Sequence, residues 1–596
     1  KILDDAYRGD VPYDVTDLRP QVLQFASRST HQADACIKKV LSMKFASASE
    51  MEPMGDYEDD SPIIFFDVEV YPNLFMIVWK ARGSEKTVTM INPTAEEVGM
   101  LIGKKLVGFN NRRYDNHVLY AAYLGYTPEQ LYMLSYKIIN SGNSRDVLFG
   151  EAYNLSYADI YDFSSVKMGL KKFQIKLGIF HQELDIPWDQ PVPEELWGKV
   201  EEYCRNDVLS TEAVFEDRAQ DFVARQILAE LSGLTLNDTT QRHTAKIIFG
   251  DDKKANQAFV YTDLAEEFPG YVYGENRDPE TNKFLGMHST YRGEVTGEGG
   301  YVYAEPGIHE NVIVLDVGSM HPTSIVQLNL FGPYTKNFKD LLDARLAIKH
   351  GKFDEARTML GGRLAPYLED VSNAKDLAYA LKIVVNIVYG LTSAKFDNPF
   401  RDRRNKDNIV AKRGALFMID LKRYMQERGY TVVHIKTDSI KLPVDEKNVT
   451  HTIDLVAEFG KKYGYDFEHE FTYERMCLVN DAVYVARYPD GLWTATGAQF
   501  QHPYVFKTLF SGEELEFDDY CEAKSVVQGR MYLDFKGNIM ANFLENGSLS
   551  DESTRTDEVI HVGRTGSFVP VRTGGADLWR IKDGQKYAVT GTKGYK

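Results

Sequence analysis

Residues 312–325 read VIVLDVGSMHPTSI and set the expectation for the fold of the C-terminal half. The apolar, β-branched run at 312–315 predicts a buried strand that delivers Asp316 to its end. Far downstream, residues 431–435 (TVVHI) predict a second strand, and Asp438 follows it at or near a hairpin turn. Two aspartates on adjacent strands can hold a pair of divalent metal ions. The pattern therefore predicts an α/β region with a two-metal site.

A predicted helix between these two aspartates carries three polar residues in an otherwise apolar run. Lys382, Asn386 and Tyr389 are spaced i, i+4 and i+7, which is one stripe of a helix. The lysine can neutralise phosphate charge, and the tyrosine can pack beside a base pair. Arg345 and Lys349, four apart on the preceding predicted helix, can face the same phosphates. The alternatives are a core helix with one snorkelling lysine, and a solvated basic face for the second pair.

The N-terminal half contains a second group of carboxylates. The buried strand at 63–66 (IIFF) runs into Asp67 and Glu69, which alternation places on one face. Two carboxylates that point together from a buried strand repel each other unless a cation lies between them. A pair of divalent metals is one solution and suits phosphodiester hydrolysis. A solvated strand end is the alternative.

Two later segments add to this group. Asp115 lies near the amide Asn110 after a short apolar strand, and Tyr203 and Asp207 are four apart on one predicted helix face. The tyrosine hydroxyl can position an attacking water while Asp207 completes a metal cage. The alternatives are a turn residue for Asn110 and a helix-surface charge for Asp207. Between these segments, residues 166–176 hold four lysines and no acid, which predicts a solvated face or a contact to single-stranded phosphate.

The composition is that of a globular protein. The chain has 596 residues, of which 43% are hydrophobic and 26% charged. Its length predicts about four domains. A formal charge of −18 argues against a surface that binds nucleic acid everywhere, although residues 395–423 carry nine Lys/Arg against four Asp/Glu and can follow duplex phosphates. The four cysteines form no CxxC pair, which argues against zinc, iron–sulfur and disulfide frameworks. No signal-peptide pattern and no transmembrane-length apolar run is present, so a cytoplasmic protein that does not enter the membrane is expected.

The first group of motifs, Asp-x-Glu, then Asn-x-x-x-Tyr-Asp, then Tyr-x-x-x-Asp, resembles the three motifs of DnaQ-type 3′→5′ proofreading exonucleases. The resemblance covers about residues 61–215. It implies that Asp67, Glu69, Asp115 and Asp207 hold the exonuclease metals, that Tyr203 orients water, and that Asn110, Lys171 and Lys172 contact single-stranded DNA.

The second group resembles family B DNA polymerases. Residues 299–302 with 305–307 are similar to the family's linker motif, residues 312–325 to motif A, residues 382–390 to motif B and residues 437–439 to the end of motif C. The resemblance implies that Asp316 and Asp438 hold the catalytic metals. It implies nucleotide contacts from Arg345, Lys349, Lys382, Asn386, Tyr389 and His321, and DNA contacts from Gly299, Gly300, Arg401, Arg403, Arg404 and Tyr484.

Three positions depart from the family pattern. His321 replaces the motif A tyrosine that lies under the incoming sugar, so altered sugar discrimination is expected. Lys436 replaces the first aspartate of motif C, and Asp481-Ala482-Val483-Tyr484 keeps only the tyrosine of the Lys-Lys-x-Tyr motif. Activity is still expected, because Asp438 takes the position of the main metal ligand in the family.

The resemblance implies an α/β and α+β multidomain fold, with an RNase H-like, DnaQ-type exonuclease followed by a right-hand polymerase. The implied boundaries are an N-terminal extension at 1–60, exonuclease at 61–230, connector at 231–300, palm with motif A at 301–340, fingers at 341–395, palm with motif C at 396–510, and thumb with the C-terminal region at 511–596.

The implied activity is template-directed DNA synthesis with proofreading, in a compact enzyme of bacteriophage type that works as a monomer. Two Mg²⁺ or Mn²⁺ ions are expected in each active site. The expected partners are primer–template DNA, a single-stranded 3′ end, dNTPs, and a replisome helicase, primase or clamp. Two alternatives remain: an exonuclease with a degenerate polymerase half that serves as a DNA-binding scaffold, and a primase-like polymerase that accepts rNTPs.

Overall fold

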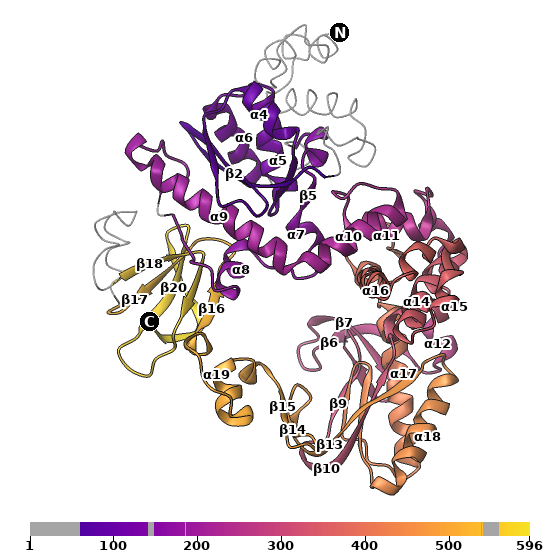
Figure 1. Ribbon diagram of the computed structural model, residues 1–596. Helices are drawn as coiled ribbons and strands as arrows, with labels where there is room; N and C mark the ends of the chain where they lie inside the picture. The colour runs from indigo at the N-terminus through magenta and orange to yellow at the C-terminus, as the bar shows by residue number, and fades with distance from the viewer. Residues whose placement is uncertain (1–59, 141–147, 185, 298, 538, 540–558) are drawn as a thin grey trace. The chain divides into compact units, whose positions relative to one another are not determined.

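The computed structural model describes residues 60–596 apart from 141–147, 185, 298, 538 and 540–558. The expected N-terminal extension, with a helix near 33–45, therefore lies outside the described residues except for Asp60. The chain divides into two compact units, one formed by Lys1–Thr240 together with Glu522–Lys596 and one formed by Gln241–Cys521. Figure 1 gives the element labels used below. Among the described residues, no helix combines the length and apolar character needed to cross a membrane.

The first unit is built on a five-stranded sheet in the order β3-β2-β1-β4-β5. Strand β1 pairs antiparallel with β2 and parallel with β4, which itself pairs parallel with β5. The central strand β1 is the predicted buried run that carries Asp67 and Glu69. The strands are β1 (Ile63–Tyr71), β2 (Leu74–Ala81), β3 (Val88–Ile91), β4 (Lys105–Gly108) and β5 (Ala158–Asp159).

Helices cover both faces of this sheet because successive side chains of β1 point to opposite sides. Phe66 and Val68 pack with α4, α5 and α6 in one core, whereas Phe65 and Tyr71 pack with α8 and α9 in another. Asp67 and Glu69 share the second face. The helices are α4 (Ala95–Ile102), α5 (Asp115–Tyr123), α6 (Pro128–Asn140), α7 (Ile160–Phe163), α8 (Leu170–Lys176), α9 (Trp197–Asp217) and α10 (Ala219–Ser232).

The C-terminal residues add a β-domain to the same unit. Strand β16 pairs with β19, and a four-stranded sheet has the order β18-β17-β20-β21. This region, called the C-terminal β-domain below, comprises residues 522–596, for which a place in the thumb region is expected from their position in the chain. Its strands are β16 (Glu522–Ser525), β17 (Arg530–Asp534), β18 (Val559–Gly563), β19 (Thr565–Phe568), β20 (Ala576–Lys582) and β21 (Gln585–Tyr595).

The second unit is built on a seven-stranded antiparallel sheet in the order β15-β14-β13-β10-β12-β11-β9. Strand β10, which includes the predicted run at 312–315, is central and pairs with β12 and β13. The strands are β9 (Val302–Ala304), β10 (Gly307–Val317), β11 (His434–Lys436), β12 (Ser439–Pro443), β13 (Phe467–Asn480), β14 (Val483–Arg487) and β15 (Trp493–Thr496).

The sequence predicts helices at about 373–395 and 408–428, and the structure of the second unit forms them as α16 and α17. Figure 1 shows α17 and α18 beside the seven-stranded sheet, where Phe417 of α17 contacts Phe467 of β13 with ring centroids 6.0 Å apart. The helices are α11 (Thr240–Phe249), α12 (Leu264–Glu267), α13 (Met320–Gln327), α14 (Thr335–Lys349), α15 (Phe353–Arg357), α16 (Val371–Ser393), α17 (Ile409–Glu427), α18 (Val449–Lys461) and α19 (Pro503–Phe506).

Three segments differ from the sequence-based expectation. The sequence, with Pro193 in a first turn, predicts a single helix over 193–230, but the structure forms two helices, α9 and α10, with Arg218 between them. The sequence also predicts a long helix over about 337–360, but α14 ends at Lys349, because Gly351 has a φ of +74° that a helix cannot accommodate. The expected connector at 231–300 holds α11, α12 and a three-stranded sheet of β6 (Val272–Arg277), β7 (Phe284–Tyr291) and β8 (Glu294–Thr296).

Candidate active sites

The first candidate site is a cavity of about 300 Å³ in the first unit. It gathers all four carboxylates that the sequence singled out in the N-terminal half. They come from three elements: β1, the first turn of α5, and the middle of α9. The lining carboxylates are Asp67, Glu69, Asp115 and Asp207.

Burial and mutual repulsion raise the pKa values in this cluster. The pKa of Glu69 is raised to about 8, first by burial and then by the charge of Asp207. Burial is also the main reason that the pKa of Asp115 is raised to about 7 and that the pKa of Asp67 lies well above its usual range. For Asp67 and Glu69, repulsion by neighbouring carboxylates adds to burial, and the positive charge of Lys171 does not offset both, which leaves a deficit of positive charge at these two residues. A set of carboxylate oxygens with this deficit fits Mg²⁺ or Mn²⁺.

Cys204 lies beside the cluster but does not fit a ligand of Mg²⁺ or Mn²⁺, because these ions prefer oxygen to thiolate ligands. Its Sγ is 3.6 Å from Oδ2 of Asp67. This sulfur and one carboxylate oxygen each from Asp67 and Glu69 all lie within 4.8 Å of one another. Burial raises the pKa of the thiol well above its usual value, so the group stays protonated and donates to Asp67.

Lys171, predicted to contact DNA, is the cation nearest to Asp207. Its Nζ lies 2.6 Å and 2.8 Å from the two carboxylate oxygens of Asp207, and 4.1 Å from the ring centroid of Tyr203. The structure therefore brings the predicted lysine, tyrosine and aspartate into one group. Lys172 is exposed on the same helix, α8.

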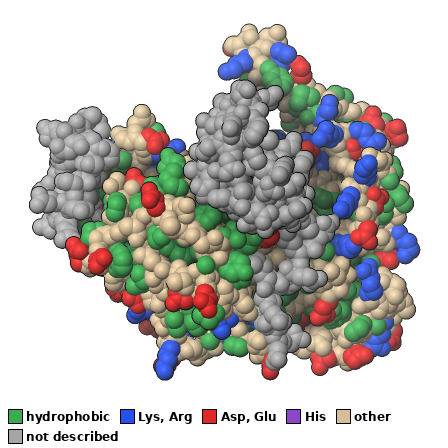
Figure 2. All heavy atoms as spheres, turned by 90° about the horizontal axis from the view of Figure 1, so that it is seen from above, with side chains coloured by type: hydrophobic (Ala, Val, Ile, Leu, Met, Phe, Trp, Pro, Cys, Tyr) green, Lys and Arg blue, Asp and Glu red, His purple; other side chains and the backbone are tan. Residues whose placement is uncertain are grey.

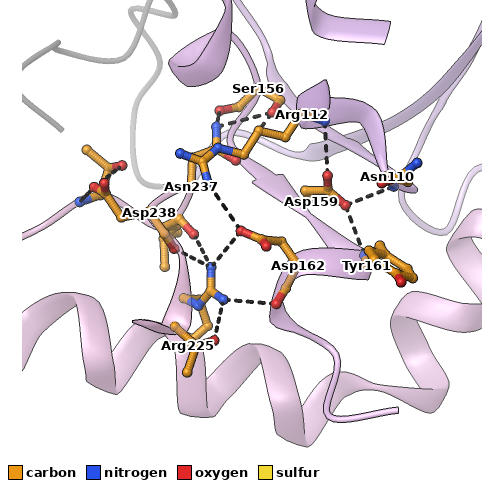
Figure 3. Close-up of polar contacts among 12 residues, drawn as sticks. Asn110, Arg112, Ser156, Asp159, Tyr161, Asp162, Arg225, Asn237 and Asp238 are labelled. Atoms are coloured by element: carbon orange, nitrogen blue, oxygen red, sulfur yellow. Dashed lines mark hydrogen bonds and ion pairs between the residues drawn. The ribbon is translucent and has the colours of Figure 1, made fainter. Parts of the chain in front are cut away.

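Asn110 lies in a loop whose position depends on Asp159, a residue that the sequence did not single out. Figure 3 shows the Asp159 carboxylate accepting hydrogen bonds from the backbone N–H groups of Asn110 (2.8 Å), Arg112 (3.0 Å) and Tyr161 (2.9 Å). Burial raises the pKa of Asp159 to about 6. Asn110 itself has a φ of 59°, a left-handed conformation that asparagine tolerates better than most residues.

Aromatic side chains form one wall of the cavity. Trp188 and Ile139 line it, and the Trp188 ring is stacked on Tyr136 with centroids 5.9 Å apart and planes 23° apart. Tyr136 is 45% exposed. This wall could not be predicted from the sequence, because Trp188 precedes α9 in an irregular segment with no periodic pattern.

The second candidate site lies on the seven-stranded sheet. Asp316, the second-last residue of β10, pairs with Ser439, and the main-chain carbonyl of Asp438 accepts a hydrogen bond from the N–H of Val317 at 2.9 Å. The pKa of Asp316 is raised to about 7, first by burial and next by the charge of Asp438. Burial likewise raises the pKa of Asp438. The predicted aspartates are thus neighbours in a partly buried site.

A β-bulge brings further carboxylates to these aspartates. Glu468 pairs with Asp316, but the register between β10 and β13 shifts at Val314/Leu315, which leaves Glu470 as the extra residue. Bulges turn side chains towards new directions and occur often beside active sites. The charge of Glu470 raises the pKa of both Asp316 and Asp438. The two glutamates are spaced i, i+2, which is the spacing that identified Asp67 and Glu69. The same signal could have identified the two glutamates.

Lys441 supplies positive charge at the second site. It is 4% exposed on β12, donates to Oγ of Ser439 at 3.1 Å, and lies 5.7 Å from the ring centroid of Tyr484. Burial lowers the pKa of Lys441 to about 8, while the charge of Asp316 acts in the opposite direction. Tyr484, the retained residue of the Lys-Lys-x-Tyr motif, therefore has a lysine beside it from another strand.

The predicted nucleotide contacts lie on α13, α14 and α16 of the same unit. Arg345 donates to Oγ of Ser319 at 3.4 Å, and Nζ of Lys349 is 3.0 Å from the carboxylate of Glu468. On α16, Lys382 and Asn386 are exposed while the helix buries its opposite face, as the spacing predicted. The ring of His321, on α13, is stacked on Tyr389.

Gly300, predicted to contact DNA, packs against the turn that carries Asp438. A Cβ at this glycine would lie 3.1 Å from the side chain of Thr437, and its φ is +155°. The N–H of Thr437 donates to the carbonyl of Tyr301 at 2.9 Å. A larger residue at 300 would therefore push on the Asp438 turn. At Gly299 a Cβ would meet no neighbouring atom.

The basic segment at 395–423 is less exposed than its composition indicates. Lys412, Arg413 and Lys422 are buried. Arg401 and Arg403 both lie within 3.4 Å of Asp397, and Arg404 forms an ion pair with Asp402 at 2.6 Å. On the face shown in Figure 2, acidic and basic side chains are interspersed among the described residues.

Two comparisons with known proteins found a similarity. Over 168 residues, 24% of this chain, the sequence is 29% identical to DNA polymerase II of Escherichia coli (strain K12), and the match spans 19% of that relative's length. The structure of the family B DNA polymerase from the hyperthermophilic archaeon Pyrobaculum calidifontis aligns over 95% of this chain and 84% of its own, with 15% identity and a TM-score of 0.41. No protein-family model matches the chain.

Proposed function

We propose that the chain is a template-directed DNA polymerase that adds dNTPs to a primer 3′-hydroxyl and carries a 3′→5′ proofreading exonuclease. The observation that carries the proposal is the pair of partly buried carboxylate clusters, one in each unit, assembled from residues far apart in sequence. The sequence similarity to a DNA polymerase supports it.

In the polymerase site, the chain's own residues bind and orient the nucleotide. Arg345, Lys349 and Lys382 provide positive charge for a triphosphate, and Lys349 exchanges its ion pair with Glu468 for phosphate when a nucleotide binds. Tyr389 and His321 form a flat surface of the kind against which a sugar or base packs. Lys441 partly offsets the charge of Asp316 and Asp438.

In the exonuclease site, the cavity binds the 3′ end of a single strand. Tyr203 orients a water molecule, and Lys171 holds Asp207 in place. Asn110, Lys171 and Lys172 are the proposed DNA contacts.

Divalent metals fit both clusters because each gathers oxygen ligands whose charge the surrounding cations do not balance. Asp67, Glu69, Asp115 and Asp207 would hold Mg²⁺ or Mn²⁺ in one site, and Asp316 and Asp438 would hold it in the other. When bound, a metal pair of this type neutralises charge on the transferring phosphoryl group and activates the attacking oxygen.

The proposed partners are primer–template DNA, dNTPs and a single-stranded 3′ end. Replication of a phage genome with a helicase, primase or clamp is proposed from the compact layout of the motifs. Gly299, Gly300, Arg401, Arg403, Arg404 and Tyr484 are the proposed duplex contacts.

Primer extension and degradation by matched variants test the proposal. The wild-type protein should extend a primer with dNTPs and shorten a single strand from its 3′ end. Asp438→Ala should lose extension and keep degradation, whereas Asp67→Ala should do the reverse. Absence of extension by the wild-type protein would overturn the polymerase assignment and favour the DNA-binding scaffold.

A further inference from the structure

The C-terminal β-domain contacts the segment that follows α8, close to the carboxylate cavity of the same unit. The Glu183 carboxylate accepts hydrogen bonds from the backbone N–H groups of Arg564 (3.2 Å) and Thr565 (3.3 Å). Gly563, with a φ of +88°, lies so close that a Cβ there would be 2.5 Å from the Glu183 side chain. The contact therefore depends on a glycine at the end of β18.

A chain of hydrogen bonds leads from this contact to a carboxylate of the cavity. Nε2 of His181 is 2.7 Å from the carbonyl oxygen of Thr565, and its Nδ1 is 3.2 Å from Oε1 of Gln174. Nε2 of Gln174 then donates to Oδ1 of Asp207 at 2.9 Å. Two side chains thus join the backbone of β19 to Asp207.

The donors and acceptors along this series of hydrogen bonds fix which atom donates at each step. Ser210 uses its hydroxyl hydrogen on the carbonyl of Asn206, so its oxygen accepts from Nε2 of Gln174. The Gln174 amide therefore points both hydrogens at Asp207 and Ser210 and turns its oxygen to His181. The two nitrogens of His181 then lie beside the Gln174 side-chain oxygen and the Thr565 carbonyl oxygen. The Glu183 carboxylate lies 3.7 Å from Nε2 of His181, so the same carboxylate contacts both the histidine and the C-terminal β-domain.

A positive charge of the same domain also acts on a residue of the cavity wall. Tyr71 lines the cavity at the end of β1. Burial raises its pKa, and the positive charge of Arg530, on β17, acts in the opposite direction. The C-terminal β-domain thus places a guanidinium within electrostatic range of the cavity wall.

We propose that the C-terminal β-domain is a working part of the exonuclease site, with His181 and Gln174 as positioning residues that hold Asp207. The inference rests on the proposed exonuclease function and adds a requirement to it. Without the Gln174 contact, Lys171 is the one hydrogen-bond partner left to the Asp207 carboxylate among the described residues, and the carboxylate can turn away from Asp67 and Glu69. Outer partners of metal ligands commonly change metal affinity or activity by about 10- to 100-fold.

Mn²⁺ binding by the full-length chain tests the inference without relying on activity. The background is an Asp316→Asn/Asp438→Asn protein, in which the polymerase site no longer competes for the ion. His181→Phe and Gln174→Leu should each weaken the remaining Mn²⁺ binding by about 10-fold. The double variant should bind Mn²⁺ only slightly more weakly than either single variant, because both changes break the same series of hydrogen bonds. His451→Phe, at an exposed position on α18, is the matched control and should bind as the background does.

Kinetics on single-stranded oligonucleotide separate positioning from substrate binding. In the otherwise wild-type chain, His181→Phe and Gln174→Leu should lower the turnover rate for exonucleolytic degradation and leave KM and primer extension unchanged. His181→Gln, which can donate to one acceptor only, should fall between wild type and His181→Phe. If thermal melting shows that His181→Phe is unstable, the turnover rates of His181→Gln and Gln174→Leu test the positioning role instead.

Failure of the proposed exonuclease function and failure of the positioning role would give different results. A wild-type chain that does not degrade single strands would overturn the proposed exonuclease function. A wild-type chain that degrades them, with His181 and Gln174 variants that match it in turnover rate and Mn²⁺ affinity, would overturn the positioning role and leave the exonuclease intact.

Discussion

The imidazole ring of His321 lies flat on the phenol ring of Tyr389, with centroids 3.9 Å apart and planes 11° apart. His321 stands where the resembled family has the tyrosine that lies under the sugar. Its Nδ1 is buried and has no hydrogen-bond partner among the described residues. Burial lowers the pKa of this histidine to about 4, so the ring is neutral at pH 7.

We therefore expect His321→Tyr to raise the preference for dNTPs over rNTPs by roughly 10-fold, the scale on which small steric differences discriminate substrates. The tyrosine is longer than the imidazole and removes the unpaired nitrogen that a ribose hydroxyl can contact. Single-nucleotide incorporation with each nucleotide type gives the ratio of kcat/KM values. Equal ratios for both proteins would exclude a role for His321 in sugar selection.

The carboxylates of the first site predict a pH-dependent stability of the metal-free protein. The pKa values of Glu69 and Asp115 are raised in the folded state to about 8 and about 7, so the folded chain binds more protons than the unfolded chain between about pH 4 and 8. Stability should therefore fall as the pH rises through this window. In EDTA, thermal melting of the first unit should occur at a lower temperature at pH 8 than at pH 6.

Glu69→Gln should remove part of this effect. Without the buried charge, we expect Tm in EDTA at pH 8 to rise by roughly 2–4 °C, the shift that about 1 kcal/mol produces in a domain of this size. Mn²⁺ should stabilise the wild-type protein more than the variant. A variant that melts below the wild type at pH 8 in EDTA would contradict the assignment of repulsion to this cluster.

Lys441 is expected to stabilise the second site in the absence of metal. Lys441→Met removes the buried ammonium and leaves Asp316, Asp438 and Glu470 without it, which we expect to lower stability by about 1–3 kcal/mol. Lys441→Arg, which keeps the charge, should lose less. Chemical denaturation in EDTA measures both, and equal stability of Lys441→Met and wild type would show that the lysine does not offset these carboxylates.

Trp188 is expected to stack on a base at the 3′ end of a single strand. Base–aromatic stacking contributes about 1–3 kcal/mol per base, so Trp188→Ala should weaken oligonucleotide binding by roughly 10-fold. Fluorescence anisotropy in EDTA, in an Asp67→Ala background, measures binding without cleavage. An oligonucleotide with an abasic 3′ residue should bind wild type and variant alike; a loss of the same size on that substrate would instead indicate a backbone contact.

Several features of this chain follow from local sequence alone. The apolar run before Asp316 and the run before Asp67 had to form buried strands, because β-branched and aromatic residues leave few other ways to remove that surface from water. The stripe of Lys382, Asn386 and Tyr389 follows from helical spacing. Alternation similarly places Asp67 and Glu69 together, whatever surrounds them.

Other features depend on contacts between distant segments. The position of Glu470 depends on a bulge in the pairing of β13 with β10, and the burial of Lys412, Arg413 and Lys422 depends on how α17 packs. No local pattern encodes the bulge or the packing of α17, because both result from which strand or helix lies opposite. The sequence by itself thus determined which carboxylates stand at strand ends and helix faces. The tertiary structure decided which of them share a cavity, and which remote residues, from Lys441 to Thr565, lie beside them, because electrostatic and hydrogen-bonded neighbours are set by packing across the chain.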